Sequence, residues 1–258
     1  MLKKIFGVLV GLMGLPLLLA QTPLRVAAAA DLEPVLPPIL AQFERTMGIH
    51  VEATYQASAA LTTQIQNGAP FDLFLSADMG YPKRLIDAGV ADAAGSADSS
   101  TPIRYAKGTL VLWARKDSQL PPPSIELLNY PGLRRLAIAN PDRAPYGRAA
   151  VAALTSLQRY DALKLRLVTA ENISQAAQFV DSGNADAGLI SLTSAMTPRL
   201  AASGRYFVIP INLYPPIEQG AVIVSRTTQR EKAHKLLDYL LSHAVQSQLA
   251  KSGLTPVR

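Results

Sequence analysis

Short apolar segments alternate with helix-like segments along most of the chain, and this alternation constrains the fold more than any other feature. In the first half, strands are predicted over residues 24–30, 50–55 and 72–77, and helices over residues 31–46, 58–67 and 80–88. Gly48, Gly68 and Gly89 follow these helices. Helices that stop at Gly between short strands are typical of βαβ units, in which parallel strands form a sheet covered by helices.

A second series of the same kind occupies the rest of the chain. Its strands are predicted over residues 108–114, 135–139, 187–192, 206–211 and 220–225, and its helices over residues 146–158, 173–181 and 229–251. Two series joined by extended segments predict an α/β protein with two lobes, in which each lobe is a mostly parallel sheet flanked by helices. We expect lobe I to hold residues 21–102 and 220–258, and lobe II to hold residues 103–219.

The first twenty residues have a different character. Lys3 and Lys4 precede an uncharged apolar run over residues 5–20, which ends before Gln21. This pattern predicts a secretory signal peptide over residues 1–20, with Ala20 as the last residue removed. An uncleaved membrane anchor is the alternative. The signal predicts a periplasmic protein, and the absence of Cys excludes disulfides, thiolate catalysis and Cys-based metal sites.

The charged residues do not indicate a nucleic-acid partner. The net charge is +6, and it falls to about +4 when the two N-terminal lysines are removed. Lys and Arg are scattered, whereas a nucleic-acid face requires a concentrated basic stripe with aromatic side chains. Catalytic motifs such as Gly-x-Ser-x-Gly, His-Glu-x-x-His and the P-loop are also missing. We therefore expect a binding protein with no cofactor, and keep a secreted hydrolase or a regulator's sensing domain as alternatives.

Four turns that lead into helices carry residues suited to an anion. They occur at residues 30–32, 56–59, 144–147 and 172–174. A helix N-terminus has unpaired N–H groups and about half a positive charge, so several converging N-termini can bind an oxyanion without Lys or Arg. Ligands of such sheets bind at the carboxyl ends of strands, which places the predicted site in the cleft between the lobes. Ordinary helix capping by Ser and Asp is the alternative interpretation.

The chain resembles the periplasmic molybdate-binding proteins of ABC transporters over essentially its whole length after the signal. The segments that carry the resemblance are residues 26–32, 56–61, 68–78, 139–147 and 214–220. The block Gly-Ala-Pro-Phe-Asp-Leu-Phe-Leu-Ser-Ala-Asp over residues 68–78 is the most specific. The resemblance implies the two-lobed fold of periplasmic binding proteins. It also implies a monomer that captures molybdate or tungstate between hinged lobes and delivers it to a membrane permease.

The resemblance also implies roles for individual residues. Ser58 matches a position that gives its hydroxyl and N–H to the anion, and Tyr146 and Ile173 match positions that give main-chain N–H groups. Ser191 stands where some members have a Tyr hydroxyl donor, and it is shorter. Molybdate is the only metal-containing group that we expect. Its predicted contacts are Asp31, Ser58, Tyr146 and Ile173, with Ser191 as a further contact. Sulfate and phosphate remain alternative ligands.

Asp31 departs from the pattern, because the family has Ser or Asn at this position. A carboxylate about 4 Å from one negative charge costs roughly 4 kcal/mol at an effective dielectric constant of about 20. Three interpretations remain open. Asp31 caps its own helix and turns away, or it holds a proton shared with the ligand, or the ligand is not a simple oxyanion or has a cation beside it.

Overall fold

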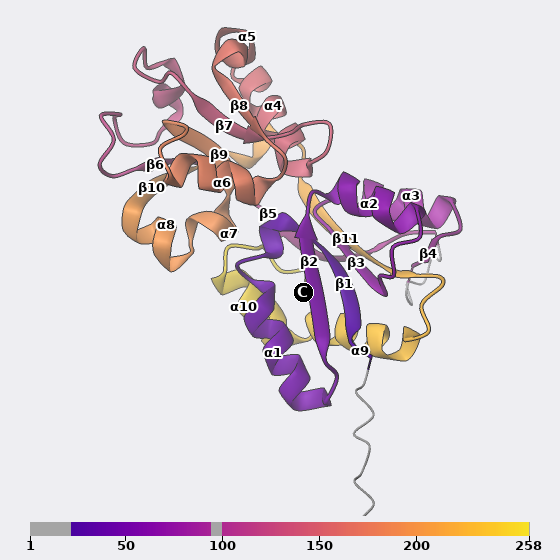
Figure 1. The fold of residues 1–258 in the computed structure, drawn as a ribbon. Helices are drawn as coiled ribbons and strands as arrows, with labels where there is room; N and C mark the ends of the chain where they lie inside the picture. Colours follow the sequence, from indigo (N-terminus) through magenta and orange to yellow (C-terminus); the bar gives the residue numbers. More distant parts are fainter. Residues whose placement is uncertain (1–21, 94–99, 258) are drawn as a thin grey trace, which may run out of the picture.

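The computed structural model describes residues 22–93 and 100–257. Two sheets, each covered by helices, form two lobes that meet at one end (Figure 1). The predicted two-lobed α/β fold is confirmed. The predicted signal peptide lies outside the described residues. Within residues 22–93 and 100–257, no helix has the length and apolar character needed to span a membrane.

The first lobe is built on a six-stranded sheet with strand order β2-β1-β3-β11-β4, in which β5 also pairs with β11. The strands are β1 (Leu24–Ala29), β2 (Val51–Gln56), β3 (Leu73–Ser76), β4 (Ala91–Asp92), β5 (Ile103–Gly108) and β11 (Ile217–Val224). The helices are η1 (Ala30–Leu32), α1 (Leu36–Met47), α2 (Ser58–Gln66), α3 (Gly80–Asp87), α9 (Arg230–Leu240) and α10 (His243–Lys251). β1 runs parallel to β2 and β3, as the alternation predicts, whereas β11 is antiparallel to its neighbours.

The second lobe is built on a five-stranded sheet with strand order β10-β6-β9-β7-β8. The strands are β6 (Leu110–Arg115), β7 (Leu136–Ala139), β8 (Leu167–Ala170), β9 (Ala187–Ser191) and β10 (Gly204–Val208). The helices are η2 (Ile125–Asn129), α4 (Pro145–Ser156), α5 (Tyr160–Leu163), η3 (Lys164–Arg166), α6 (Ile173–Asp181), α7 (Leu192–Ala195), α8 (Pro198–Ser203) and η4 (Ile211–Leu213). β7 is parallel to β8 and β9, and β6 is antiparallel to β9 and β10, so both sheets are mixed rather than mostly parallel.

The chain crosses between the lobes after β5 and before β11. The antiparallel pairing of these two strands joins residues 103–108 to residues 217–221, so both belong to the first sheet. The crossings therefore lie a few residues inside the predicted lobe boundaries at 103 and 219. The register of this pair shifts between Gln219 and Gly220, which marks a β-bulge next to the crossing.

Two predicted helices differ in the structure. Residues 31–46 divide into η1 and α1, since Pro37 and Pro38 lack the N–H groups that a continuous helix would need there. The single helix predicted over residues 229–251 is wrong, because α9 ends at Leu240 and α10 begins at His243. Ser242 caps α10, since its side chain accepts a hydrogen bond from the Val245 N–H. The Gln246 amide donates to the Leu240 carbonyl at 2.8 Å and satisfies an acceptor left open by this break.

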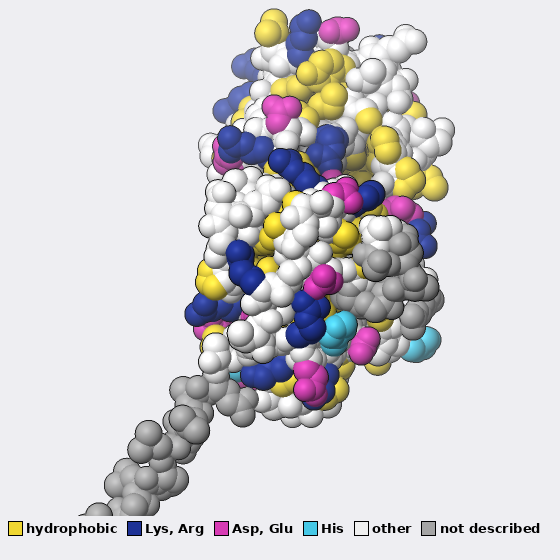
Figure 2. All heavy atoms as spheres, turned by 90° about the vertical axis from the view of Figure 1, so that its right-hand side faces the viewer, with side chains coloured by type: hydrophobic (Ala, Val, Ile, Leu, Met, Phe, Trp, Pro, Cys, Tyr) yellow, Lys and Arg dark blue, Asp and Glu magenta, His cyan; other side chains and the backbone are white. Residues whose placement is uncertain are grey.

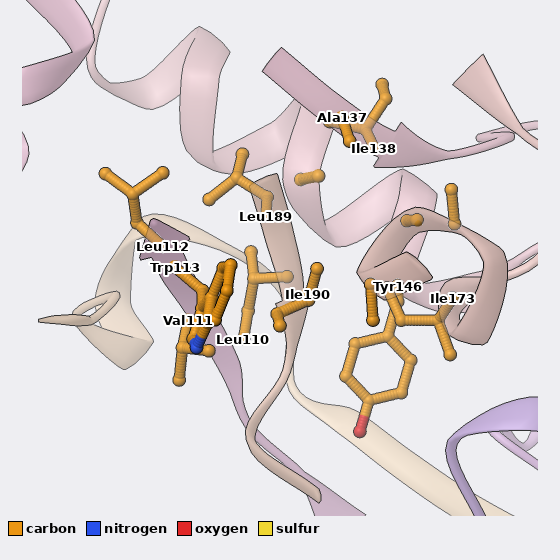
Figure 3. Close-up of a cluster of buried hydrophobic side chains, with 14 of the residues drawn as sticks. Leu110, Val111, Leu112, Trp113, Ala137, Ile138, Tyr146, Ile173, Leu189 and Ile190 are labelled. Carbon is orange, nitrogen blue, oxygen red and sulfur yellow. The ribbon is translucent and has the colours of Figure 1, made fainter. Parts of the chain in front are cut away.

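Figure 2 shows a face on which Lys and Arg side chains are interspersed with Asp and Glu side chains over both lobes. Inside the second lobe, a buried apolar cluster surrounds β6, and Tyr146 and Ile173 lie beside each other within it (Figure 3). The same cluster includes Ala29, Ala57 and Ala77 of the first lobe, so the lobes pack against each other where β1, β2 and β3 end.

Candidate functional site

Four of the five predicted anion contacts line one small cavity between the lobes. Asp31, Ser58, Tyr146 and Ile173 belong to η1, α2, α4 and α6, and they line a cavity with a volume of about 10 Å³. This volume is far below the range of about 300–1,000 Å³ typical of pockets for drug-sized ligands. The cavity therefore suits only a small ligand. None of the residues that line it in the described chain is His, Lys, Arg or Glu.

The first lobe contributes the N-terminus of α2. The Ser58 hydroxyl accepts a hydrogen bond from the Ala77 N–H at 3.1 Å, which leaves its own O–H free to donate elsewhere. Ala57, the residue before the helix, makes no side-chain capping bond in the described chain, and a first-position N–H such as that of Ser58 has no partner within its helix. Ser58 is buried, so it offers two donors at the cavity wall.

The second lobe contributes the N-termini of α4 and α6. α4 begins at Pro145, which has no N–H, so Tyr146 supplies the first main-chain donor of that helix. In α6 the Asn172 side chain accepts from the Gln175 N–H at 2.9 Å and leaves the N–H of Ile173 uncapped. A Cβ added to Gly147 would lie 2.3 Å from the Ala139 carbonyl oxygen, so this Gly lets α4 approach the end of β7 closely.

The Asp31 carboxyl joins three parts of the molecule. Its Oδ2 accepts hydrogen bonds from the Gln219 amide of β11 and from the Tyr146 hydroxyl of α4, the latter at 3.2 Å. No described residue donates to its Oδ1, and the whole residue is buried. Burial raises the pKa of Asp31 from 3.8 to about 6, although the hydrogen bonds from Gln219 and Tyr146 act in the opposite direction.

The interpretation that Asp31 caps its own helix and turns away is wrong. η1 has no side-chain capping bond, and the carboxyl lies at the lobe interface instead. At pH 7, protonating a carboxyl with a pKa of about 6 costs roughly 1.4 kcal/mol. This is less than the roughly 4 kcal/mol that two like charges about 4 Å apart would cost. The cavity therefore accepts an anion more readily when Asp31 is neutral.

Three residues that were not among the predicted contacts also shape the site. Thr193 donates its hydroxyl to the Asp31 carbonyl, and Ser174 donates its hydroxyl to the Ala30 carbonyl, both at 2.8 Å and both across the lobes. A Cβ added to Gly108 would lie 2.1 Å from the Tyr146 hydroxyl oxygen, so only Gly gives this phenol room to reach Asp31. The sequence signal for Gln219 was its place in residues 214–220, one of the segments that carry the family resemblance.

The structure does not bring Ser191 to the cavity. Its side chain caps α7 by accepting from the Ser194 N–H at 3.2 Å, and its hydroxyl also donates to the Ser194 hydroxyl at 2.9 Å. The Thr193 hydroxyl oxygen lies 2.9 Å from the Ser191 hydroxyl oxygen as well. A short side chain at the end of a strand is thus used by the next helix before it can reach a ligand.

A cluster at the rim of the cleft also links the lobes. The Arg148 guanidinium of α4 pairs with the Asp78 carboxylate that follows β3, and it lies 5.4 Å from the centre of the Tyr81 ring. The Tyr81 hydroxyl donates to the Asp142 carbonyl at 3.3 Å. We call Asp78, Tyr81 and Arg148 the rim cluster. With the bonds at Asp31 and Ala30, it holds the lobes together around the cavity.

The chain is similar in sequence and in fold to known bacterial binding proteins. Residues 24–255 match the family described as bacterial extracellular solute-binding proteins. The molybdate-binding protein of Azotobacter vinelandii is 36% identical over 84% of this chain and 83% of its own length. That of Rhodobacter capsulatus is 34% identical over 93% of this chain and 91% of its own length. A solved periplasmic molybdate-binding protein from Azotobacter vinelandii superposes with a TM-score of 0.83 at 30% identity, covering 91% of this chain and all of that structure.

Proposed function

The chain belongs to the bacterial extracellular solute-binding proteins and groups there with the molybdate-binding proteins, and we propose that it captures molybdate or tungstate for an ABC transporter. One observation carries this proposal. The N-termini of α2, α4 and α6, with the Ser58 hydroxyl, converge on a single small cavity between the lobes. Such an arrangement suits an oxyanion, because main-chain N–H groups and helix dipoles both favour negative charge.

The proposed contacts account for tight binding. Ser58 gives its hydroxyl and N–H from the first lobe, and Tyr146 and Ile173 give main-chain N–H groups from the second. Each hydrogen bond to a charged group contributes about 1.5–3 kcal/mol. Four such bonds give about 6–12 kcal/mol, which spans the roughly 8 kcal/mol of a micromolar complex. The tetrahedral shape of the anion lets its oxygens face donors from both lobes at once.

Binding proceeds by closure of the lobes about the two crossings. The anion first meets Ser58 and Asp31 on the first lobe, and the second lobe then adds Tyr146 and Ile173. The rim cluster and the bonds to the Ala30 and Asp31 carbonyls form in the closed state. In this proposal the closed monomer works in the periplasm and docks on a membrane permease, which receives the anion when the lobes open.

Titration calorimetry with molybdate, tungstate, sulfate and phosphate tests the proposal. We expect the tightest binding with molybdate and tungstate, and weaker or no binding with sulfate and phosphate. A preference for sulfate or phosphate would keep the oxyanion function and change the ligand. No heat with any of the four anions would contradict the function.

A further inference from the structure

We propose that the Asp31 carboxyl is protonated in the anion-bound state and donates a hydrogen bond to a ligand oxygen. The protein then takes up one proton for each anion that it captures. This inference rests on the proposed oxyanion function and adds a chemical role for one side chain. The proton comes from solvent while the lobes are open. The closed site then holds the charge of the anion alone.

The hydrogen bonds of the carboxyl decide where the proton resides. Oδ2 already accepts from the Gln219 amide and the Tyr146 hydroxyl, whereas none of the described groups donates a hydrogen bond to Oδ1. A buried polar atom with no partner is costly, and a carboxylate oxygen can only accept. With a proton on Oδ1, the same atom becomes a donor in a residue that lines the cavity. A bound oxyanion supplies the missing acceptor.

Gln219 and Tyr146 act as positioning residues. Gln219 is fully buried on β11, beside the bulge near the start of that strand. Tyr146 reaches Asp31 from α4 of the second lobe. Because both donate to the same oxygen, they orient the carboxyl and direct Oδ1 to the ligand. The arrangement is complete only when the lobes are closed, since Asp31 and Tyr146 belong to different lobes.

No described positive side chain offsets the charge of Asp31. The titratable groups that face it are the phenols of Tyr146 on α4 and Tyr105 on β5, and burial together with the Asp31 charge raises the pKa of both well above the usual range. Both phenols therefore stay neutral. Ser58 and Thr193, from α2 and α7, are also neutral. In the rim cluster, Arg148 and Asp78 form an ion pair and neutralise each other.

The direction of the pH effect follows from these charges. Burial raises the Asp31 pKa to about 6 without a ligand, and the negative charge of the anion raises it further. When the lobes open, water reaches the carboxyl and its pKa falls toward the ordinary value. Affinity is therefore highest at low pH. It falls about tenfold for each pH unit, the slope of a single linked proton, until pH exceeds the pKa of the bound state.

Calorimetry of molybdate binding in buffers with different heats of ionisation counts the protons taken up. We expect the wild type at pH 7.5 to take up close to one proton per anion, with Kd rising about tenfold per unit between pH 6.5 and 8.5. Asp31→Asn should take up none and bind with a pH-independent Kd, because its amide is a fixed donor. The matched control is Asp181→Asn, a mostly buried carboxyl paired with Arg199 outside the cavity, which should behave as wild type.

The outcomes separate this inference from the proposed function. Molybdate binding to the wild type with no proton uptake and a Kd that does not change with pH would overturn the inference and leave the function standing. This result needs no variant, so it holds even if Asp31→Asn does not fold. No binding of any oxyanion at any pH would overturn both.

Discussion

The two walls of the cavity differ in chemistry. In the binding mode that we propose, the wall from the first lobe offers side chains, the Ser58 hydroxyl and the Asp31 carboxyl, whereas the wall from the second lobe offers the main-chain N–H groups of Tyr146 and Ile173. A side chain can be deleted or titrated, but a main-chain donor survives almost every substitution. The first-lobe wall should therefore respond to pH and to conservative substitution, and the second-lobe wall only to changes that remove an N–H.

The largest effect is expected when a main-chain donor is removed. Ile173→Pro deletes one N–H at the first position of α6, where Pro is tolerated and the extended Asn172 before it is compatible. Loss of a bond to a charged ligand, worth about 1.5–3 kcal/mol, predicts Kd rising by about 10- to 150-fold. Ile173→Val keeps the N–H and should change Kd little. Equal losses in the two variants, measured by calorimetry, would show that the side chain rather than the backbone binds.

Next in size is the effect of the buried Asp31 carboxyl on stability. Burial raises the pKa of Asp31 in the folded protein from 3.8 to about 6. Below pH 4 the carboxyl is neutral in the folded protein and its burial costs little stability. This stability is lost as pH rises through about 6, because the buried carboxyl then ionises. Asp31→Asn does not ionise, and without ligand it should be more stable than wild type by about 3 kcal/mol above pH 7 and similar to it near pH 4. Urea unfolding at both pH values measures this. A difference that does not depend on pH would contradict it.

Ser58→Ala should weaken binding by about tenfold or slightly more, because the anion loses one hydroxyl donor. The Ala77 N–H also loses its acceptor, so a modest loss of stability is expected. Ser58→Thr keeps the hydroxyl and separates these effects. If Ser58→Ala binds molybdate as tightly as wild type, the Ser58 hydroxyl does not face the ligand. The first-lobe wall would then bind the anion without this side-chain donor, as the second-lobe wall does with main-chain N–H groups.

The smallest effect is expected at the rim cluster, because Asp78, Tyr81 and Arg148 are not among the described residues that line the cavity. Arg148→Met keeps much of the apolar stem and removes the partly exposed ion pair with Asp78. Such pairs contribute about 1 kcal/mol or less, so Kd should rise no more than about fivefold, mainly through faster release. Stopped-flow measurement of the dissociation rate checks this. A loss as large as that of Ile173→Pro would mean that Arg148 touches the anion.

The sequence predicted the two walls unequally well. Ser58, Tyr146 and Ile173 each follow a strand and begin a helix, and such local patterns are readable from neighbouring residues. The Asp31 environment was not readable, because its partner Gln219 is 188 residues away and Tyr146 is 115 residues away. Ser191 had the right place at a strand end, but the sequence did not reveal that α7 would use its side chain as a cap.

The most direct test of the account is a crystal structure with molybdate, in which anomalous scattering locates the molybdenum. The account predicts one ion in the cavity between the lobes, with its oxygens about 2.7–3.2 Å from the Ser58 hydroxyl and from the Tyr146 and Ile173 nitrogens. It also predicts the Asp31 carboxyl within hydrogen-bond distance of a ligand oxygen. An ion held elsewhere, or bound by groups of one lobe alone in a closed molecule, would contradict it.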